Sequence, residues 1–189
     1  MGTSKVETMA NPRRVEVEEQ AARADAFRTL ADRHLDASYR LAQVILGQRA
    51  EAEDATHDAF VTAWRKWSTL RDPELFEHWF DRILVNTCRN RLRHASHRRT
   101  EELSADREFV ASSDPFAPMH DRGQLWPAMA RLAPDQRVIV ALRFYRDLSI
   151  DQIAAHLGVR AGTVKSRLHR GLRGLRMSLD EADPMRTLR

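Results

Sequence analysis

Apolar residues recur along this chain at the three- and four-residue spacing of amphipathic α-helices, and no alternating β-strand pattern stands out. The spacing predicts helices over about residues 21–47, 51–67, 74–97, 124–132 and 134–146, and two more between 149 and 175. Gly47 would end the first helix, and Pro134 is suited to a first helical position. The pattern leaves open whether residues 21–47 form one helix or two broken near Asp36. We therefore expect an all-α protein.

The segment between residues 98 and 122 interrupts this pattern with charges, serines and two prolines, and it carries few apolar residues. Such a length of linker is unusual inside one compact domain, so we expect two small helical domains joined by a flexible linker. The predicted boundaries are a disordered tail at 1–20, a domain at 21–97, the linker at 98–122, a domain at 123–180 and a tail at 181–189.

The most informative stretch runs from residue 148 to residue 175. Ser149 and Gln152 fit a capping box, in which each side chain satisfies a backbone amide at the start of a helix. Gly158 can adopt the positive φ that ends a helix, and a second helix is predicted to begin near Ala161. The stretch is therefore expected to form two short helices joined by a tight turn.

The second of these helices is strongly basic on its outer side. Val164, Leu168 and Leu175 supply its inner face, and no acidic residue lies between Arg160 and Arg176. Two helices joined by a glycine turn, with the second basic, form a helix-turn-helix, whose second helix enters the major groove of DNA. The alternative is a basic amphipathic helix on a solvated surface, or one that targets a membrane or a protein partner. The capped first helix and the turn favour DNA binding.

The run LSIDQIAAHLGV, followed after two residues by GTVKSRLHRG, resembles region 4 of the extracytoplasmic-function group of bacterial RNA polymerase sigma factors. Gly162 to Arg170 is the specific part of the match. The resemblance implies that this helix reads the −35 promoter element. Arg160 stands where relatives often carry serine or proline, so it either weakens the helix cap or adds a phosphate contact. The candidate −35 residues are Arg160, Thr163, Lys165, Ser166, Arg167, His169, Arg170 and Arg173.

The predicted helix at 51–67 has a face of small residues and an acidic face. On residue pattern alone, the acidic face is as consistent with an ordinary solvated surface as with a binding site. The run EAEDATHDAFVTAWRKW resembles region 2.2 of the same sigma factors, which docks on the β′ coiled coil of core polymerase. His57 replaces the glutamine usual in that family. The implied core-binding residues are Glu51, Asp54, Asp58, Phe60 and Trp64.

The predicted helix at 74–97 carries a polar, basic stripe suited to following a nucleic-acid backbone. The run FEHWFDRILVNTCRNRL resembles regions 2.3 and 2.4, which melt and read the −10 element, and the turn before it corresponds to a loop that captures an unpaired base. Trp79 either stacks on a base or belongs to the core. The candidate −10 residues are Arg71, Asp72, Trp79, Arg82, Asn86, Arg89, Asn90 and Arg93.

Composition removes several other classes of protein. Cys88 is the single cysteine, so no internal disulfide forms, and no apolar run reaches the roughly 20 residues that cross a bilayer. Of the eight histidines, only His94 and His97 have the spacing of metal ligands, and they lie at a helix end whose arginines repel cations, with no matching cysteines or acidic cluster. Phosphate-binding glycine loops and nucleophile elbows are missing from the sequence. We expect no catalytic residue, metal or cofactor, and a cytoplasmic location.

The sequence is therefore identified as resembling an extracytoplasmic-function sigma factor over most of its length. The implied partners are core RNA polymerase, through its β′ coiled coil and β flap, promoter DNA, and an anti-sigma factor. A stand-alone helix-turn-helix regulator, or a protein that sequesters another factor, remains the alternative. The acidic helix beside a basic, aromatic one favours the sigma factor, because an ordinary regulator needs no such docking surface.

Overall fold

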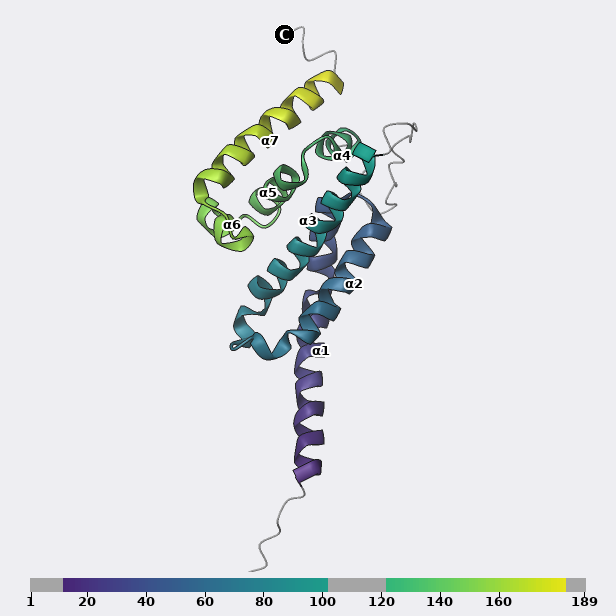
Figure 1. Cartoon of the computed structure of the whole chain (residues 1–189), viewed down its shortest axis with the longest axis vertical. Coiled ribbons are helices and arrows are strands. Elements are labelled where there is room, and N and C mark those ends of the chain that lie inside the picture. Colours follow the sequence, from purple (N-terminus) through teal and green to yellow (C-terminus); the bar gives the residue numbers. More distant parts are fainter. Residues whose placement is uncertain (1–11, 102–121, 183–189) are drawn as a thin grey trace, which may run out of the picture.

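The structure, a computed structural model, describes residues 12–101 and 122–182, and its described residues are helical with no strand (Figure 1). The all-α prediction is confirmed. The predicted linker lies almost entirely outside the described residues, and so do most of the two predicted tails.

Three long helices form the first group: α1 (Pro12–Leu46), α2 (Arg49–Arg65) and α3 (Phe76–Glu101). α1 is one helix, which settles the alternative near Asp36, and Gly47 ends it with a φ of +83°. α1 begins at Pro12, whereas the sequence predicted a tail up to residue 20; proline at the first helical position is well suited to this start. The beginning of α1 projects beyond the rest of the group (Figure 1).

Alanines allow α2 to approach its neighbours closely. Ala52, Ala55, Ala59 and Ala63 are all fully buried, and α2 packs against both α1 and α3. Two short 3₁₀ turns, η1 (Trp67–Thr69) and η2 (Pro73–Leu75), connect α2 to α3. Asp72 caps η2 by accepting a hydrogen bond from the Glu74 amide at 2.9 Å. The α2–α3 connection is thus a structured turn, as the proline at 73 predicts.

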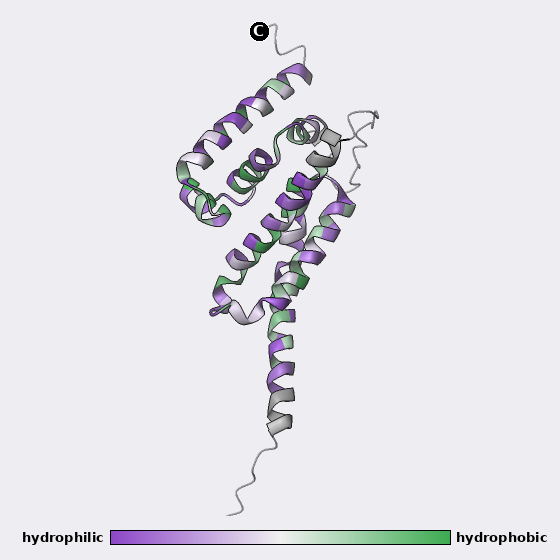
Figure 2. Ribbon diagram, viewed as in Figure 1, coloured by the Kyte–Doolittle hydropathy of each residue, from purple (hydrophilic) through white to green (hydrophobic). Residues whose placement is uncertain are grey.

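Four helices form the second group: α4 (Arg122–Ala130), α5 (Pro134–Phe144), α6 (Ile150–Leu157) and α7 (Ala161–Ala182). The predicted capping box is present, with Ser149 and Gln152 each satisfying a backbone amide. Gly158 ends α6 with a φ of +65°. In Figure 2 the ribbon of α7 is mostly hydrophilic, whereas α5, which packs against it, carries more hydrophobic residues. The helix-turn-helix prediction is confirmed.

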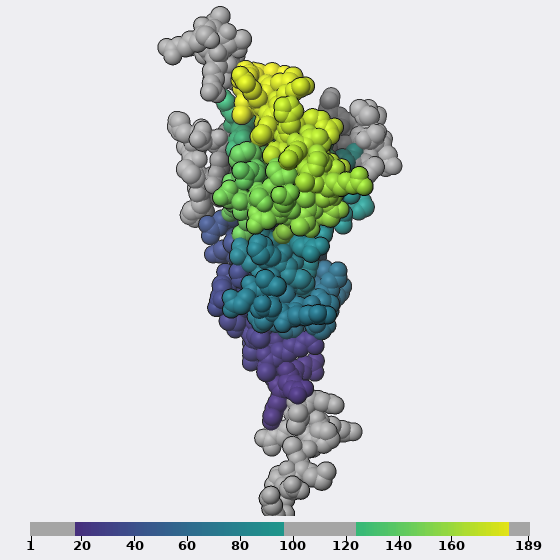
Figure 3. All heavy atoms as spheres, turned by 90° about the vertical axis from the view of Figure 1, so that its left-hand side faces the viewer, coloured from purple at the N-terminus to yellow at the C-terminus, as the bar shows by residue number. Residues whose placement is uncertain are grey.

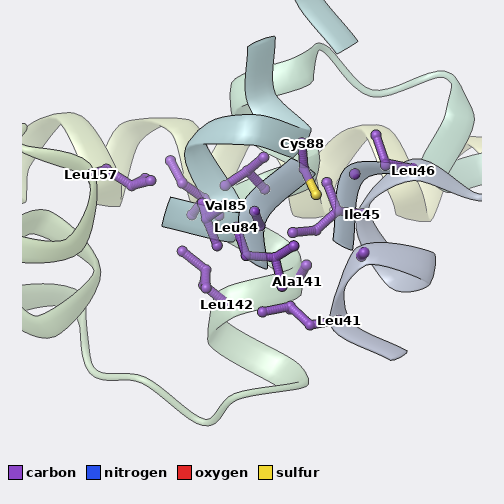
Figure 4. Packing of buried hydrophobic residues seen from close by; sticks show 14 of the residues in the cluster. Leu41, Ile45, Leu46, Leu84, Val85, Cys88, Ala141, Leu142 and Leu157 are labelled. Atoms are coloured by element: carbon purple, nitrogen blue, oxygen red, sulfur yellow. The ribbon is translucent and has the colours of Figure 1, made fainter. Parts of the chain in front are cut away.

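The two groups lie against each other (Figure 3). Their buried residues form a continuous cluster, in which Leu84 and Val85 of α3 meet Ala141 and Leu142 of α5 (Figure 4). The turn between α1 and α2 also touches the second group, because a Cβ added to Gly47 would lie 3.0 Å from the Trp126 ring. The free chain is therefore closed, with α3 facing α5 and α6.

Candidate nucleic-acid interface

Helix α7 is held in place by close packing on its inner side. Val164 is fully buried and Leu175 nearly so. Gly171 lies against Val140 and Gly174 against Leu132, at distances where an added Cβ would stand 3.2 and 3.1 Å from those side chains. Two glycines on one face thus let α7 approach its neighbours, which leaves the opposite, basic face of α7 directed outward.

Most candidate −35 residues lie on that outer face. Ser166 donates to the Thr163 carbonyl oxygen at 3.0 Å, and Arg170 donates to the Ser166 carbonyl oxygen at 3.3 Å, so both side chains fold back on their own helix. The exposed members of the set are Arg160, Lys165, Ser166, His169, Arg170 and Arg173, whereas Thr163 is half-buried.

Arg167 differs from its neighbours because it faces α5. Its side chain is only 27% exposed and lies 2.9 Å from Oδ2 of Asp135. The same Arg167 nitrogen lacks a well-aligned hydrogen-bond acceptor in the structure, so the contact is an ion pair and not an oriented hydrogen bond. Asp135 is the second residue of α5, just after Pro134.

The candidate −10 stripe on α3 divides into two parts. Arg82, Asn86 and Asn90 are exposed. Arg89 and Arg93 instead bind Asp135: the Arg89 Nε lies 2.6 Å from Oδ1, and an Arg93 nitrogen lies 3.1 Å from the same oxygen.

The structure therefore brings three candidate DNA-contacting arginines, from two separate faces, to one carboxylate. Burial by itself raises the pKa of Asp135, but the hydrogen bonds and charge of Arg89, with the charges of Arg167 and Arg93, hold this pKa below its usual value. Asp135 stays ionised and bound to arginine over the physiological pH range. The sequence reasoning missed this role, because an acid in the first turn of a helix is already explained by the helix dipole.

The remaining −10 candidates sit in or near the α2–α3 turn. Arg71 is exposed, but the Asp72 carboxylate is occupied by its cap on η2. The Trp79 ring is half-buried, with its centroid 6.4 Å from the Trp67 centroid and 6.0 Å from the Phe76 centroid. This packing favours the core interpretation of Trp79 over base stacking.

The acidic face of α2 is partly neutralised by an arginine that the sequence reasoning missed. Arg91 of α3 lies 2.9 Å from Glu51, 2.6 Å from Asp58 and 3.9 Å from Asp54. The three carboxylates remain largely exposed around it. Arg91 therefore positions these carboxylates and leaves net negative charge on the surface.

The two aromatic residues of the candidate core-binding set differ in exposure. Phe60 stacks on Phe80, with ring centroids 4.3 Å apart, so its ring is part of the packing between α2 and α3. Trp64 is 40% exposed, and its ring makes a T-shaped contact with the ring of Phe27, with the ring centroids 5.2 Å apart. Trp64 is thus the member of this pair that offers apolar surface to a partner.

A second buried polar group joins α3 to the far end of α5. Arg146 lies 2.8 Å from Asp81 and 3.1 Å from Glu77, and His156 of α6 forms a hydrogen bond with the backbone of Asp81. Burial raises the pKa of Asp81 to about 6, despite the opposing charge of Arg146. Burial likewise lowers the pKa of His156 to about 4. These residues were also missed by sequence reasoning.

The described part of the chain gathers no three histidine, cysteine or acidic residues that could hold a metal ion. Within that same part, no helix has both the length and the apolar character to cross a membrane.

Comparisons with protein-family models place two matches on the chain in order. The model "Sigma-70 region 2" matches residues 30–98, which covers most of the first helical group. The model "Sigma-70, region 4" matches residues 122–175, which begins at α4 and ends within α7.

Curated relatives align across both groups. RNA polymerase sigma-E factor of Streptomyces avermitilis is 35% identical over 149 residues, covering 78% of this chain and 82% of the relative. ECF RNA polymerase sigma factor SigL of Mycobacterium tuberculosis is 32% identical over 165 residues, covering 85% of this chain and 93% of the relative. ECF RNA polymerase sigma factor SigE of Mycolicibacterium smegmatis is 36% identical over 152 residues, covering 78% of this chain but only 59% of that longer relative.

Two solved structures share the fold. The sigma factor RpoE, in complex with the anti-sigma factor NepR from Bartonella quintana, superposes with a TM-score of 0.67 at 25% identity, over 82% of this chain and 96% of that chain. CnrH, in complex with the cytosolic domain of CnrY, gives a TM-score of 0.58 at 23% identity, over 85% of this chain and 96% of that chain. The second comparison supports the fold alone.

Proposed function

The chain belongs to the extracytoplasmic-function RNA polymerase sigma factors, and we propose which of its surfaces carry out the work of such a factor. As a sigma factor it directs core RNA polymerase to promoters by recognising −35 and −10 elements and by assisting promoter melting. The polymerase performs the chemistry, and this chain supplies recognition without catalysis of its own.

We assign the −35 element to the outer face of α7. Lys165, Arg170 and Arg173 are exposed on the second helix of the helix-turn-helix, where arginine can donate two hydrogen bonds to guanine. Arg167 joins this face once it leaves Asp135. Arg160, at the start of α7, is placed to contact a backbone phosphate.

We assign the −10 element, as single-stranded DNA, to the exposed polar stripe of α3. Arg82, Asn86 and Asn90 are available in the closed chain, and Arg89 and Arg93 extend the stripe when the second group moves away. Arginine tracks phosphates, and asparagine can bond the base edges that melting exposes. Arg71 in the turn before α3 is a candidate for the pocket that holds an unpaired base.

We assign polymerase binding to the acidic face of α2. Glu51, Asp54 and Asp58 present exposed carboxylates ordered by Arg91, and Trp64 adds exposed apolar surface on the same helix. The proposed partner element is the β′ coiled coil, and the second group would contact the β flap. In this proposal the two polymerase-binding domains are those predicted at residues 21–97 and 123–180.

We further propose that an anti-sigma factor regulates this chain, supported by the likeness to RpoE in its complex with NepR. The proposed location is the bacterial cytoplasm, at the nucleoid when the factor is active.

The observation that carries the proposal is the order of surfaces along one chain: an acidic docking helix, a basic aromatic helix, then a capped helix-turn-helix. The test is transcription by purified bacterial core polymerase on fragmented genomic DNA, with and without this protein. Discrete new start sites sharing two upstream elements support the proposal. Absence of new transcripts, together with tight duplex binding by the protein alone, would support the stand-alone regulator.

A matched pair of variants locates the −35 contact in the same assay. Arg170→Ala should reduce transcription from the new start sites. Arg176→Ala removes an equally basic, 85% exposed side chain from the same helix, one turn beyond Arg173, the last residue proposed to contact the −35 element, and should leave transcription unchanged. Equal loss in both variants would show a general charge effect in place of promoter reading.

A further inference from the structure

Helices α3 and α5 run antiparallel along their interface, as the ion pairs at its two ends show. Near the start of α3, Glu77 and Asp81 pair with Arg146, which follows the end of α5. Further along α3, Arg89 and Arg93 pair with Asp135 at the start of α5. Glu77 and Asp81 are four residues apart, and so are Arg89 and Arg93, so the two members of each pair lie on the same side of α3.

We propose that these two ion-pair clusters form an electrostatic latch that holds the free protein closed, with arginines of both candidate DNA faces neutralised by Asp135 until polymerase separates the two groups. The Asp135 cluster consists of Asp135, Arg89, Arg93 and Arg167. The Arg146 cluster consists of Arg146, Glu77 and Asp81. This proposal rests on the proposed function, since it concerns the control of the same DNA-binding faces.

The Asp135 carboxylate binds Arg89 in the manner in which a DNA phosphate binds an arginine. It binds the fork of Arg89 through both oxygens, with Nε to Oδ1 at 2.6 Å and a second nitrogen to Oδ2 at 3.3 Å, which is how arginine binds a phosphate. The Arg89 side chain is 15% exposed in this state. An arginine so enclosed cannot contact DNA without first leaving Asp135.

The charges of the Asp135 cluster also allow it to be opened. One carboxylate faces three guanidinium groups, so positive charge remains in excess, and a polyanion competes well for it. The apolar surface between the groups opposes opening, because Leu84 and Val85 would lose their contacts with Ala141 and Leu142. While the Asp135 cluster is intact, opening therefore requires a partner that covers this surface or supplies new contacts to both groups.

The proposal is tested by measuring the separation of the two groups with spin labels, without DNA or polymerase. Asp32→Cys on α1 and Met177→Cys on α7 provide two exposed attachment sites, and the native Cys88 is fully buried. The parent should give one narrow, short distance distribution. Asp135→Asn should add longer distances, whereas Asp147→Asn, which removes an almost fully exposed charge from the same group, should not.

A charge swap guards against simple misfolding. Asp135→Arg should open the protein fully, and adding Arg89→Asp should shift the distances back toward those of the parent. A broad distribution in the parent, or parent-like distances in both Asp135 variants, would overturn the latch. Because this measurement involves no promoter, its failure leaves the transcription test of the proposed function untouched, and the reverse also holds.

Binding to a single-stranded oligodeoxythymidine probe gives a second readout. Asp135→Asn and Asp147→Asn remove the same charge. Asp147 pairs with Arg143 at 3.4 Å, whereas Asp135 pairs with Arg89, Arg93 and Arg167, so only Asp135→Asn should free arginines of the candidate DNA faces. The slope of log affinity against log salt should therefore steepen for Asp135→Asn by about 0.7 for each additional phosphate contacted. Equal slopes for the two variants would contradict the release of arginines from Asp135.

Discussion

Arg89 of α3 donates from Nε to Oδ1 of Asp135 in α5 at 2.6 Å, across 46 positions of sequence. The same carboxylate lies 2.9 Å from Arg167 on the second helix of the helix-turn-helix. One side chain thus stands between the two candidate DNA faces. Substitutions near it are expected to change both faces together.

Arg167→Ala should weaken transcription that depends on the −35 element and leave polymerase binding intact. Loss of a contact to a base costs about 1–3 kcal/mol, which corresponds to a decrease of roughly 5- to 150-fold. Transcription from several promoters, with a parallel pull-down of core polymerase, measures both quantities. Parent-like transcription from all of them would remove Arg167 from the reading face.

Asp54→Arg combined with Asp58→Arg should abolish binding to core polymerase, because the acidic face of α2 becomes basic beside Arg91. The matched control is Asp25→Arg with Asp32→Arg, which reverses two exposed acids on α1. Circular dichroism establishes that both proteins remain helical. Normal pull-down of core by the α2 variant would show that polymerase docks elsewhere.

Asp81 and His156 should give the free energy of unfolding opposite dependences on pH. Burial raises the pKa of Asp81 from 3.8 to about 6, so its stabilising contribution is present below pH 3.8 and lost as pH rises through 6. Burial lowers the pKa of His156 from 6.5 to about 4, so its contribution is present above pH 6.5 and lost as pH falls through 4. Each group changes the free energy of unfolding by about 1.4 kcal/mol per pH unit between its two pKa values. Between about pH 4 and pH 6 the changes from Asp81 and His156 have opposite signs and nearly cancel.

Denaturant unfolding between about pH 4.5 and 6 separates the two groups. In His156→Gln only Asp81 contributes to the pH dependence, so the free energy of unfolding should decrease with rising pH relative to the parent. In Asp81→Asn only His156 contributes to the pH dependence, so the free energy of unfolding should increase with rising pH relative to the parent. Identical pH profiles for the two variants would show that neither residue titrates as its burial indicates.

Cys88 should be unreactive in the folded protein. Its side chain is fully buried on α3, and burial raises the pKa of its thiol to about 12, so almost no thiolate forms at neutral pH. A colorimetric thiol reagent should therefore react slowly with native protein and at once with protein in concentrated denaturant. Rapid reaction of the native protein would mean that the packing around α3 opens readily.

Gly158→Ala should destabilise the helix-turn-helix by about 1–2 kcal/mol, because alanine is strained in the left-handed region that the φ of +65° requires. No atom would obstruct the added methyl group, so backbone strain is the cause. Gly162→Ala, in the first turn of α7 and equally free of obstruction, should be neutral or slightly stabilising. Thermal unfolding compares the two, and equal effects would argue against strain at Gly158.

Local patterns in the sequence were sufficient for the helices and for the helix-turn-helix. Ser149, Gln152 and Gly158 act on residues within four positions, so their effect can be inferred from the sequence alone. The basic outer face of α7 followed from the same local spacing, whereas its assignment to the −35 element came from the family resemblance. The start of α1 was misplaced because a polar helix that projects from the bundle has no apolar stripe to reveal it.

The ion pairs between helices could not be inferred in the same way. Arg91 reaches Asp58 across 33 positions and Arg146 reaches Asp81 across 65, and every charged stripe offers many possible partners. Only the packing of α3 on α2 and on the second group selects among them. For the same reason the sequence did not show that Arg89, Arg93 and Arg167 meet at Asp135.

The most direct test of the account is footprinting on one promoter fragment obtained from the transcription assay. Protein alone, core polymerase alone and the two together are compared by nuclease protection and by permanganate reactivity of unpaired thymines. The account predicts protection of both upstream elements and reactive thymines near the start site only when polymerase and this protein are both present. Strong protection of the duplex by the protein alone, unchanged by polymerase, would contradict it.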